Sequence, residues 1–263
     1  MARIADAFSR LRTGTEPGLV AYVTAGDPDL ARTAEILISL GHNGADVLEV
    51  GIPFSDPLAD GPVIQRASER ALASGSTLRG ALEMIRRTRA AIDAPIVLFT
   101  YVNPVLRMGE AAFVSAAADA GVDGVLVLDL PVEEAGPFRD RLVGAALDPI
   151  FLLSPTTTDA RIRASSDLGR GFLYVISRLG VTGARDQVSS DAESLVGRIR
   201  KHTELPLALG FGISTPEQVS EVGRWADAAV VGSALVNVIA THGAAPNVAG
   251  RAGAYVRWLK GRT

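Results

Sequence analysis

Short runs of apolar residues alternate along the chain with segments in which apolar residues recur every three or four positions. The short runs have no helical period, and glycine, proline or aspartate bounds them. This pattern is typical of strands that are buried on both faces. We interpret eight runs as strands: Leu19–Thr24, Asp46–Gly51, Ala94–Tyr101, Val122–Leu128, Pro149–Leu153, Gly171–Ile176, Pro206–Leu209 and Ala228–Val231.

The segments between these runs predict helices. The first is expected to open at Asp27-Pro28, interpreted as an N-cap and a first-turn proline. The other predicted helices lie around Leu78–Ile85, Phe113–Val114, Pro131–Leu147, the residues after Thr158, Leu195–Ile199, Pro216–Val222, Leu235–Ile239 and Tyr255–Leu259. An amphipathic pattern through Ile4, Phe8 and Leu11 predicts one further helix before the first strand.

A strand followed by a helix, repeated about eight times, indicates a parallel α/β sheet. Eight such units close most naturally into a (β/α)8 TIM barrel, and a doubly wound open sheet is the alternative. No linker, low-complexity tract or change of composition divides the 263 residues. We therefore expect a single TIM-barrel domain over residues 1–263 with an extra N-terminal helix.

The composition narrows the classes of function. The chain is 48% hydrophobic, has a formal net charge of −3 and contains no basic block, which argues against nucleic acid or a membrane surface as the main partner. It has no cysteine, so disulfides and thiolate chemistry are excluded. The N-terminus lacks the apolar core of a signal peptide, and no apolar run is long enough to span a bilayer. A cytoplasmic protein is expected.

Three late loops are rich in glycine: Gly180–Gly183, Gly210–Ser214 and Gly232–Ala234. They follow the sixth, seventh and eighth predicted strands, where TIM barrels carry their active sites and often bind phosphate. Glycine lets backbone N–H groups approach an anion closely, although tight turns also need it. As a set, the loops predict a phosphate site and hence a phosphate ester as substrate.

Amine and metal chemistry are disfavoured by position. The two lysines, Lys201 and Lys260, lie on late outer helices, whereas a Schiff-base aldolase needs lysine in the site. The three histidines, His42, His202 and His242, lie near helix ends without the spacing of metal ligands. We therefore expect neither a metal site nor a cofactor attached through lysine.

Carboxylates remain for proton transfer. Glu49 lies inside the second strand, and Asp60 lies in the proline-rich loop that follows it. Apolar walls would raise the pKa of Glu49, whereas Asp60 in a more polar loop would stay charged and stabilise a developing cation. Asp27, Asp56 and Asp129 are lesser candidates, and Asp27 and Asp129 are also interpreted as caps. The alternative for Glu49 is a paired core glutamate beside a rigid surface turn.

These residues resemble a known family. The sequence is similar to the tryptophan synthase α subunit family over essentially its whole length, and the long motif Glu49–Pro62 is the most specific match. The other matching segments are Thr24–Pro28, Tyr101–Pro104, Asp129–Glu134, Ser177–Ala184 and Gly210–Ser214.

The resemblance implies a TIM barrel that cleaves indole-3-glycerol phosphate to indole and glyceraldehyde 3-phosphate. It also implies an α2β2 assembly with a β subunit, which holds pyridoxal phosphate and joins indole to serine, and no cofactor in this chain. Three alternatives remain: a stand-alone lyase, another phosphate-barrel enzyme such as a sugar-phosphate isomerase, and a non-catalytic phosphate-binding barrel that regulates a partner.

The resemblance also implies roles for individual residues. Glu49 is the general acid–base, Asp60 binds the indole N–H, and Thr182 steadies Asp60 when the loop Leu179–Ser190 closes over substrate. Phosphate contacts are expected from Gly183, Gly212, Gly232 and Ser233, and the indole pocket from Tyr22, Phe99, Leu126, Leu152, Tyr174 and Phe211. Pro53, Asp56, Asn103 and Pro104 are expected to face the β subunit. Position 22 departs from the family, because many relatives have phenylalanine there.

Overall fold

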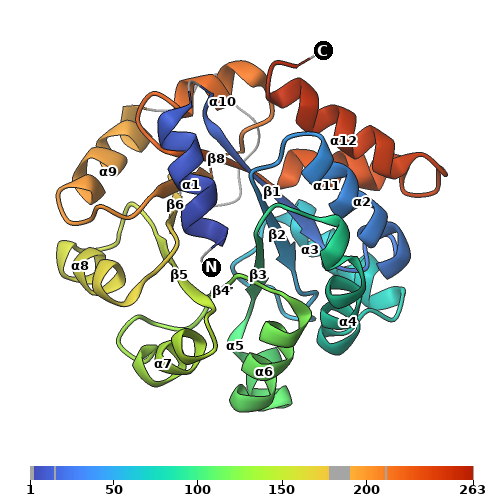
Figure 1. Ribbon diagram of the computed structural model, residues 1–263, viewed down its shortest axis with the longest axis horizontal. Coiled ribbons are helices and arrows are strands. Elements are labelled where there is room, and N and C mark those ends of the chain that lie inside the picture. The colour runs from blue at the N-terminus through green and yellow to red at the C-terminus, as the bar shows by residue number, and fades with distance from the viewer. Residues whose placement is uncertain (1–2, 15, 178–189, 211, 263) are drawn as a thin grey trace.

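Eight parallel strands close into a barrel in the order of the chain, with β1 paired to both β2 and β8 (Figure 1). The computed structural model describes residues 3–14, 16–177, 190–210 and 212–262. The strands are β1 (Gly18–Thr24), β2 (Val47–Gly51), β3 (Ile96–Thr100), β4 (Gly124–Val127), β5 (Asp148–Leu153), β6 (Leu173–Ile176), β7 (Leu207–Gly210) and β8 (Ala228–Val231). The predicted TIM barrel is confirmed, and the open sheet is wrong.

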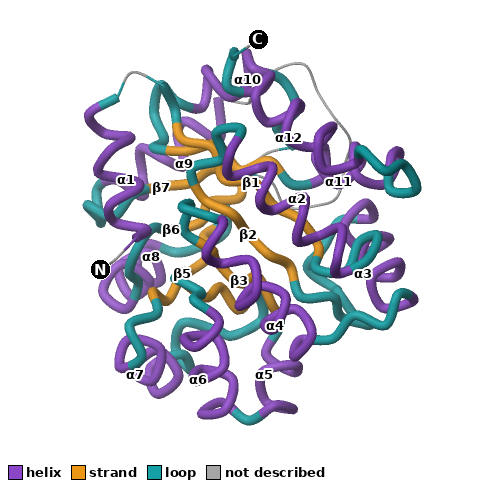
Figure 2. Tube along the Cα trace, turned by 45° about the vertical axis from the view of Figure 1, so that its right-hand side comes forward, coloured by secondary structure: helices purple, strands orange, loops and turns teal. Residues whose placement is uncertain are grey.

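Helices surround the strands on the outside (Figure 2). They are α1 (Arg3–Thr13), α2 (Leu30–His42), α3 (Pro62–Ala73), α4 (Leu78–Thr88), η1 (Arg89–Ala91), α5 (Val102–Met108), α6 (Glu110–Ala120), α7 (Gly136–Gly144), α8 (Asp159–Leu168), α9 (Ser190–Arg200), α10 (Pro216–Val222), α11 (Ser233–His242) and α12 (Val248–Leu259). No helix in the described ranges is long and apolar enough to cross a membrane.

Side chains on each strand alternate between two hydrophobic clusters. Val20, Val47 and Val97 point into the barrel, whereas their neighbours on the same strands pack outward against the helices. The predicted N-terminal helix is confirmed as α1, whose Ile4 and Phe8 belong to the inner cluster. Figure 1 shows α1 lying across the barrel, so this helix closes one end of the barrel interior. The opposite end, where the strands finish, is the end at which TIM barrels carry their active sites.

Three aspartates hold neighbouring strands together where the strands begin. Asp46 precedes β2, Asp123 precedes β4 and Asp227 precedes β8, and each accepts a backbone N–H near the start of the preceding strand at 2.8 Å, from Leu19, Ile96 and Leu207 respectively. Each aspartate also pairs with cations: Lys260 for Asp46, Arg3 and Arg89 for Asp123, and Arg12 and Arg200 for Asp227. The end of the barrel opposite the predicted site is therefore a structural end.

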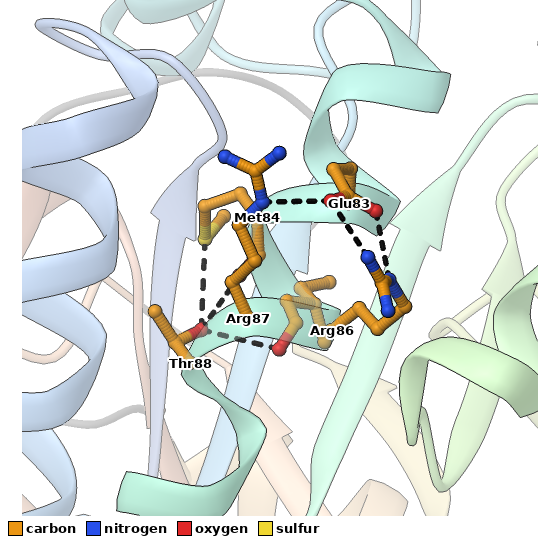
Figure 3. Close-up of polar contacts among 6 residues, drawn as sticks. Glu83, Met84, Arg86, Arg87 and Thr88 are labelled. Atoms are coloured by element: carbon orange, nitrogen blue, oxygen red, sulfur yellow. Dashed lines mark hydrogen bonds and ion pairs between the residues drawn. The ribbon is translucent and has the colours of Figure 1, made fainter.

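The outer helix faces carry ion pairs of a different kind. On α4, the Glu83 carboxylate accepts from Arg86 and Arg87 at 2.7–2.9 Å, as Figure 3 shows. These hydrogen bonds lower the pKa of Glu83 to about 2. Because all three side chains are exposed to solvent, these ion pairs contribute little to stability.

Several predicted boundaries are wrong. The first helix after β1 begins at Leu30 with Asp29 as its N-cap, so Asp27 caps nothing, because its carboxylate pairs with Arg70 instead. Helix α3 is absent from the prediction, although Pro62 is its first residue, a position at which proline is common.

Two other helices differ from prediction. The predicted helix over Pro131–Leu147 is confined to α7, since residues 132–134 form turns and Ala146 has a positive φ of 59°. The helix predicted around Phe113 is α6, and α5 precedes it beyond Gly109. Both differences arise at turn residues, which a helical period does not reveal.

Candidate active site

Glu49 lies on the inner face of β2, at the end of the barrel opposite α1. Its register partners are Tyr22 on β1 and Val97 on β3, and its side chain is wholly buried. Neither carboxyl oxygen has a hydrogen-bond partner among the residues that the structure describes. Burial, and next the charge of Asp60, raise the pKa of Glu49 to about 8. The group therefore holds a proton at neutral pH without a structural partner there, which disfavours the paired core glutamate.

Asp60 lies in the loop between β2 and α3, and two side chains hold it. The Tyr101 hydroxyl donates to Asp60 Oδ2 at 3.0 Å, and Gln65 of α3 donates to the Asp60 backbone carbonyl at 2.9 Å. Burial raises the pKa of Asp60 to about 6, against the opposing effect of the Tyr101 hydrogen bond. At neutral pH Asp60 is thus mostly charged while Glu49 is mostly neutral, so the two acids can take different roles.

Aromatic rings line the barrel beside these acids. Tyr22 meets Phe99 edge-on with ring centroids 5.3 Å apart, and Phe99 lies 6.3 Å from Tyr174. Leu126 of β4 is fully buried beside Phe99, and Leu152 of β5 is the register partner of Tyr174. Burial first, and then the charges of nearby acids, raise the pKa of both tyrosines. The wall is therefore aromatic and largely apolar, and it lies close to both carboxyl groups.

The described glycines of the loops after β7 and β8 lie at the same end of the barrel. Gly232 follows β8, and a Cβ atom placed on it would lie 3.7 Å from the Tyr22 Cβ. Gly232 is the N-cap of α11 and supplies no side-chain cap, so backbone N–H groups at Ser233 and beyond remain for an anion. In the loop after β7, Gly212 is exposed with φ 69°, and the Tyr255 hydroxyl holds the Ser214 carbonyl at 2.7 Å.

Three predicted site residues fall outside the described residues. They are Thr182 and Gly183 in the loop after β6, and Phe211 after β7. The expected closure of Leu179–Ser190 concerns the same stretch. Their predicted roles stay predictions.

The lysines and histidines, which the sequence disfavours as catalytic groups, lie away from Glu49 and Asp60. The Lys260 ammonium is held at 3.0 Å by Asp46, at the structural end of the barrel, and Lys201 follows α9 on the outside. His42 ends α2, His242 ends α11, and His202 lies 3.6 Å from Asp159 on α8. Within the described ranges, no group of three or more histidine, aspartate or glutamate side chains could hold a metal ion.

The lesser acidic candidates have other partners. Asp27 is buried and accepts two hydrogen bonds from Arg70, at 2.8 and 2.6 Å. Asp129 accepts the Val102 N–H at 2.6 Å, at the start of α5, and Asp56 is exposed beside Ser55. Glu49 and Asp60 are therefore the pair that the fold brings together with the aromatic wall.

Tyr101 is a contact residue of the site that sequence reasoning did not single out. It stands directly after β3, the position at which barrel enzymes place functional side chains. Its position at the end of a predicted strand is the sequence feature that could have identified it. Its partner Asp60 is 41 residues away in sequence, so the pairing itself was not readable from the chain.

Comparison with known proteins agrees with this geometry. The family model for the tryptophan synthase alpha chain matches residues 8–257. The tryptophan synthase alpha chain of Citrifermentans bemidjiense is 52% identical over 90% of this chain and 88% of its own length. That of Geobacter sulfurreducens is 50% identical over 90% of each chain.

Solved structures give the same result. The alpha subunit of Legionella pneumophila superposes with a TM-score of 0.91 at 36% identity, covering 99% of this chain and 98% of its own. A chain of the tryptophan synthase a2b2 complex of Pyrococcus furiosus superposes with a TM-score of 0.86 at 37% identity, covering 94% and 98%. The chain belongs to the tryptophan synthase alpha chain family.

Proposed function

We propose that this chain cleaves indole-3-glycerol phosphate to indole and glyceraldehyde 3-phosphate, a carbon–carbon lyase reaction. The observation that carries the proposal is Glu49. It is a wholly buried acid on the inner face of the barrel, it lacks a hydrogen-bond partner among the described residues, and its pKa is raised to about 8. A structural carboxylate would be paired, whereas a proton donor must keep its proton for the substrate.

The proton of Glu49 passes to C3 of the indole ring and produces a cationic indolenine. The bond between C3 and the glycerol carbon then breaks, and its electron pair returns to the ring. The hydroxyl on that carbon becomes the aldehyde of glyceraldehyde 3-phosphate and gives its proton to the Glu49 carboxylate. Glu49 therefore ends the cycle protonated, as it began, and no other acid or base is required.

Asp60 supports the cation that this step creates. Its pKa of about 6 leaves it charged at neutral pH, and its carboxylate accepts the indole N–H as positive charge develops on the ring. Thr182 is proposed to steady Asp60 from the loop after β6. One charge placed in advance at such a position contributes about 3 kcal/mol of transition-state stabilisation.

The two ends of the substrate fit two parts of the barrel. The indole lies against the wall of Tyr22, Phe99 and Tyr174, with Leu126, Leu152 and Phe211 completing the pocket. The phosphate binds the backbone N–H groups at Gly183, Gly212, Gly232 and Ser233, where the N-terminus of α11 adds a favourable dipole.

A β subunit is proposed as the partner, in an α2β2 assembly like the Pyrococcus furiosus complex. Exposed apolar side chains on the outer loops of the catalytic end support a partner surface there. Leu58, after β2, is 94% exposed, and Leu106 on α5 is 56% exposed, close in sequence to the expected contacts Asp56 and Asn103. Pro53, also expected there, is buried. Pyridoxal phosphate belongs to the β partner in this proposal. The cytoplasmic location stays a prediction.

The test is an assay of indole release from indole-3-glycerol phosphate, with and without a tryptophan synthase β subunit. We expect slow release by the chain alone and much faster release in the complex. Equal rates would favour a stand-alone lyase. Substrate that is not consumed in either case would contradict the lyase and leave an isomerase or a non-catalytic regulator. Glu49→Gln, which should abolish cleavage but keep substrate binding, is the matched negative control.

A further inference from the structure

The Tyr101 hydroxyl has two partners, and both lie on the loop that carries Asp60. It donates to Asp60 Oδ2 at 3.0 Å and accepts from the Ala59 N–H at 3.1 Å. The hydroxyl thus acts as both donor and acceptor to two neighbouring residues, Ala59 and Asp60. A carboxylate held through Oδ2 keeps Oδ1 for a second donor. The contact therefore selects one orientation of Asp60 rather than only closing the loop.

Tyr101 is itself firmly placed. It directly follows β3 and precedes α5, and its side chain is 4% exposed. Its ring packs on Phe54 with centroids 5.1 Å apart, and the next residue, Val102, donates its N–H to Asp129 at 2.6 Å. The loops after β2, β3 and β4 therefore meet at Tyr101. Because a strand end moves less than a loop, Tyr101 holds Asp60 and not the reverse.

We propose that Tyr101 is a positioning residue that holds the Asp60 carboxylate in the orientation in which it meets the indole N–H. This inference rests on the proposed lyase function, since it concerns the residue that stabilises the indolenine. The same hydrogen bond favours the charged form of Asp60 over the neutral form. Tyr101 thus acts on both the orientation and the charge of Asp60.

Tyr101→Phe removes the hydroxyl and keeps the ring on Phe54. We expect kcat for indole-3-glycerol phosphate cleavage to fall about 10- to 100-fold, the scale of one hydrogen bond to a charged group, with a smaller change in KM. In the Asp60→Asn background the same substitution should cause little further loss, because Tyr101 acts through Asp60. Fully multiplicative losses in the double variant would overturn the proposal.

A second readout does not depend on turnover. The pKa of the Asp60 carboxyl, followed by carbon NMR in the substrate-free protein, should rise in Tyr101→Phe. If 3-fluorotyrosine replaces Tyr101, its more acidic hydroxyl should lower that pKa without risk to folding. The control is Tyr255→Phe, which removes the hydroxyl that donates to Ser214 at 2.7 Å and should leave the pKa of Asp60 in place.

The outcomes separate the two hypotheses. If the wild-type chain consumes no indole-3-glycerol phosphate with a β subunit present, the lyase function fails, whatever the titration shows. If the wild-type chain is active but neither Tyr101 replacement moves the pKa of Asp60, the positioning role fails alone.

Discussion

The hydroxyl end of Tyr22 occupies the space that a side chain on Gly51 would need. The two residues lie on β1 and β2, and a Cβ atom on Gly51 would overlap the Tyr22 ring and hydroxyl. The same hydroxyl lies 3.3 Å from Thr24 Oγ1, so it has a fixed place in the barrel. Since Glu49 is the register partner of Tyr22, the glycine two residues beyond the catalytic candidate allows tyrosine to wall the pocket.

This contact predicts that Gly51→Ala destabilises the protein by about 1–3 kcal/mol, the usual cost of overpacking a core. Thermal or denaturant unfolding measures the effect. Adding Tyr22→Phe should recover part of the loss, because the hydroxyl is the nearest obstacle. Gly136→Ala is the control, since nothing lies within 4 Å of its added methyl group. Equal stabilities of the two alanine variants would contradict the packing argument.

The two raised pKa values predict a bell-shaped pH dependence of kcat/KM. Asp60 must be charged, so activity should rise as pH increases through about 6, and Glu49 must be protonated, so activity should fall as pH increases through about 8. Steady-state rates of indole release between pH 5 and 9 test this. A profile that stays flat over that range would mean that neither acid controls the chemistry.

Glu49 should also make the fold less stable in alkali. The folded protein keeps the Glu49 proton up to about pH 8, whereas the unfolded chain loses it near pH 4.5, so unfolding releases a proton between these values. Stability must then fall as pH rises through this window, by at most about 5 kcal/mol. Glu49→Gln removes this cost. We expect it to match the wild type at pH 5 and exceed it at pH 9 in urea unfolding.

Asp60→Asn should lower the cleavage rate strongly and leave the affinity for glyceraldehyde 3-phosphate intact. The reason is that Asp60 faces the indole end of the proposed pocket, whereas the phosphate end is built from glycine loops. Single-turnover rates and product-inhibition constants separate the two effects. A large loss of affinity for this product would show that Asp60 belongs to the phosphate end instead.

Asp123→Ala should be far more damaging than loss of an exposed ion pair. It removes the acceptor of the Ile96 N–H and leaves Arg89, whose side chain is only 12% exposed, without its carboxylate. We expect a loss of about 3–5 kcal/mol. Asp140→Ala is the control, because the Asp140 side chain is 73% exposed and its pair with Arg139 should contribute less than about 1 kcal/mol. Similar unfolding midpoints for both variants would refute the bracing role of Asp123.

Much of the architecture was readable from the chain. Apolar runs such as Val125–Leu128 and Ala228–Val231 lack polar alternation, which is typical of a parallel sheet covered on both faces. Their repetition with helices therefore favoured the barrel over an open sheet and placed Glu49 inside the second strand. Helix starts were less readable, because Asp27 and Asp29 are both good caps in sequence. Only the position of Arg70 in space decides between them.

The sequence by itself determined the barrel, the two acids and the glycine loops, because periodicity and residue type are local properties of the chain. The tertiary structure decided how those acids behave. Burial and the proximity of Asp60 raise the pKa of Glu49, and a tyrosine 41 residues away holds Asp60. Such effects depend on distance and solvent exclusion between segments remote in sequence, so they exist only once the barrel has closed.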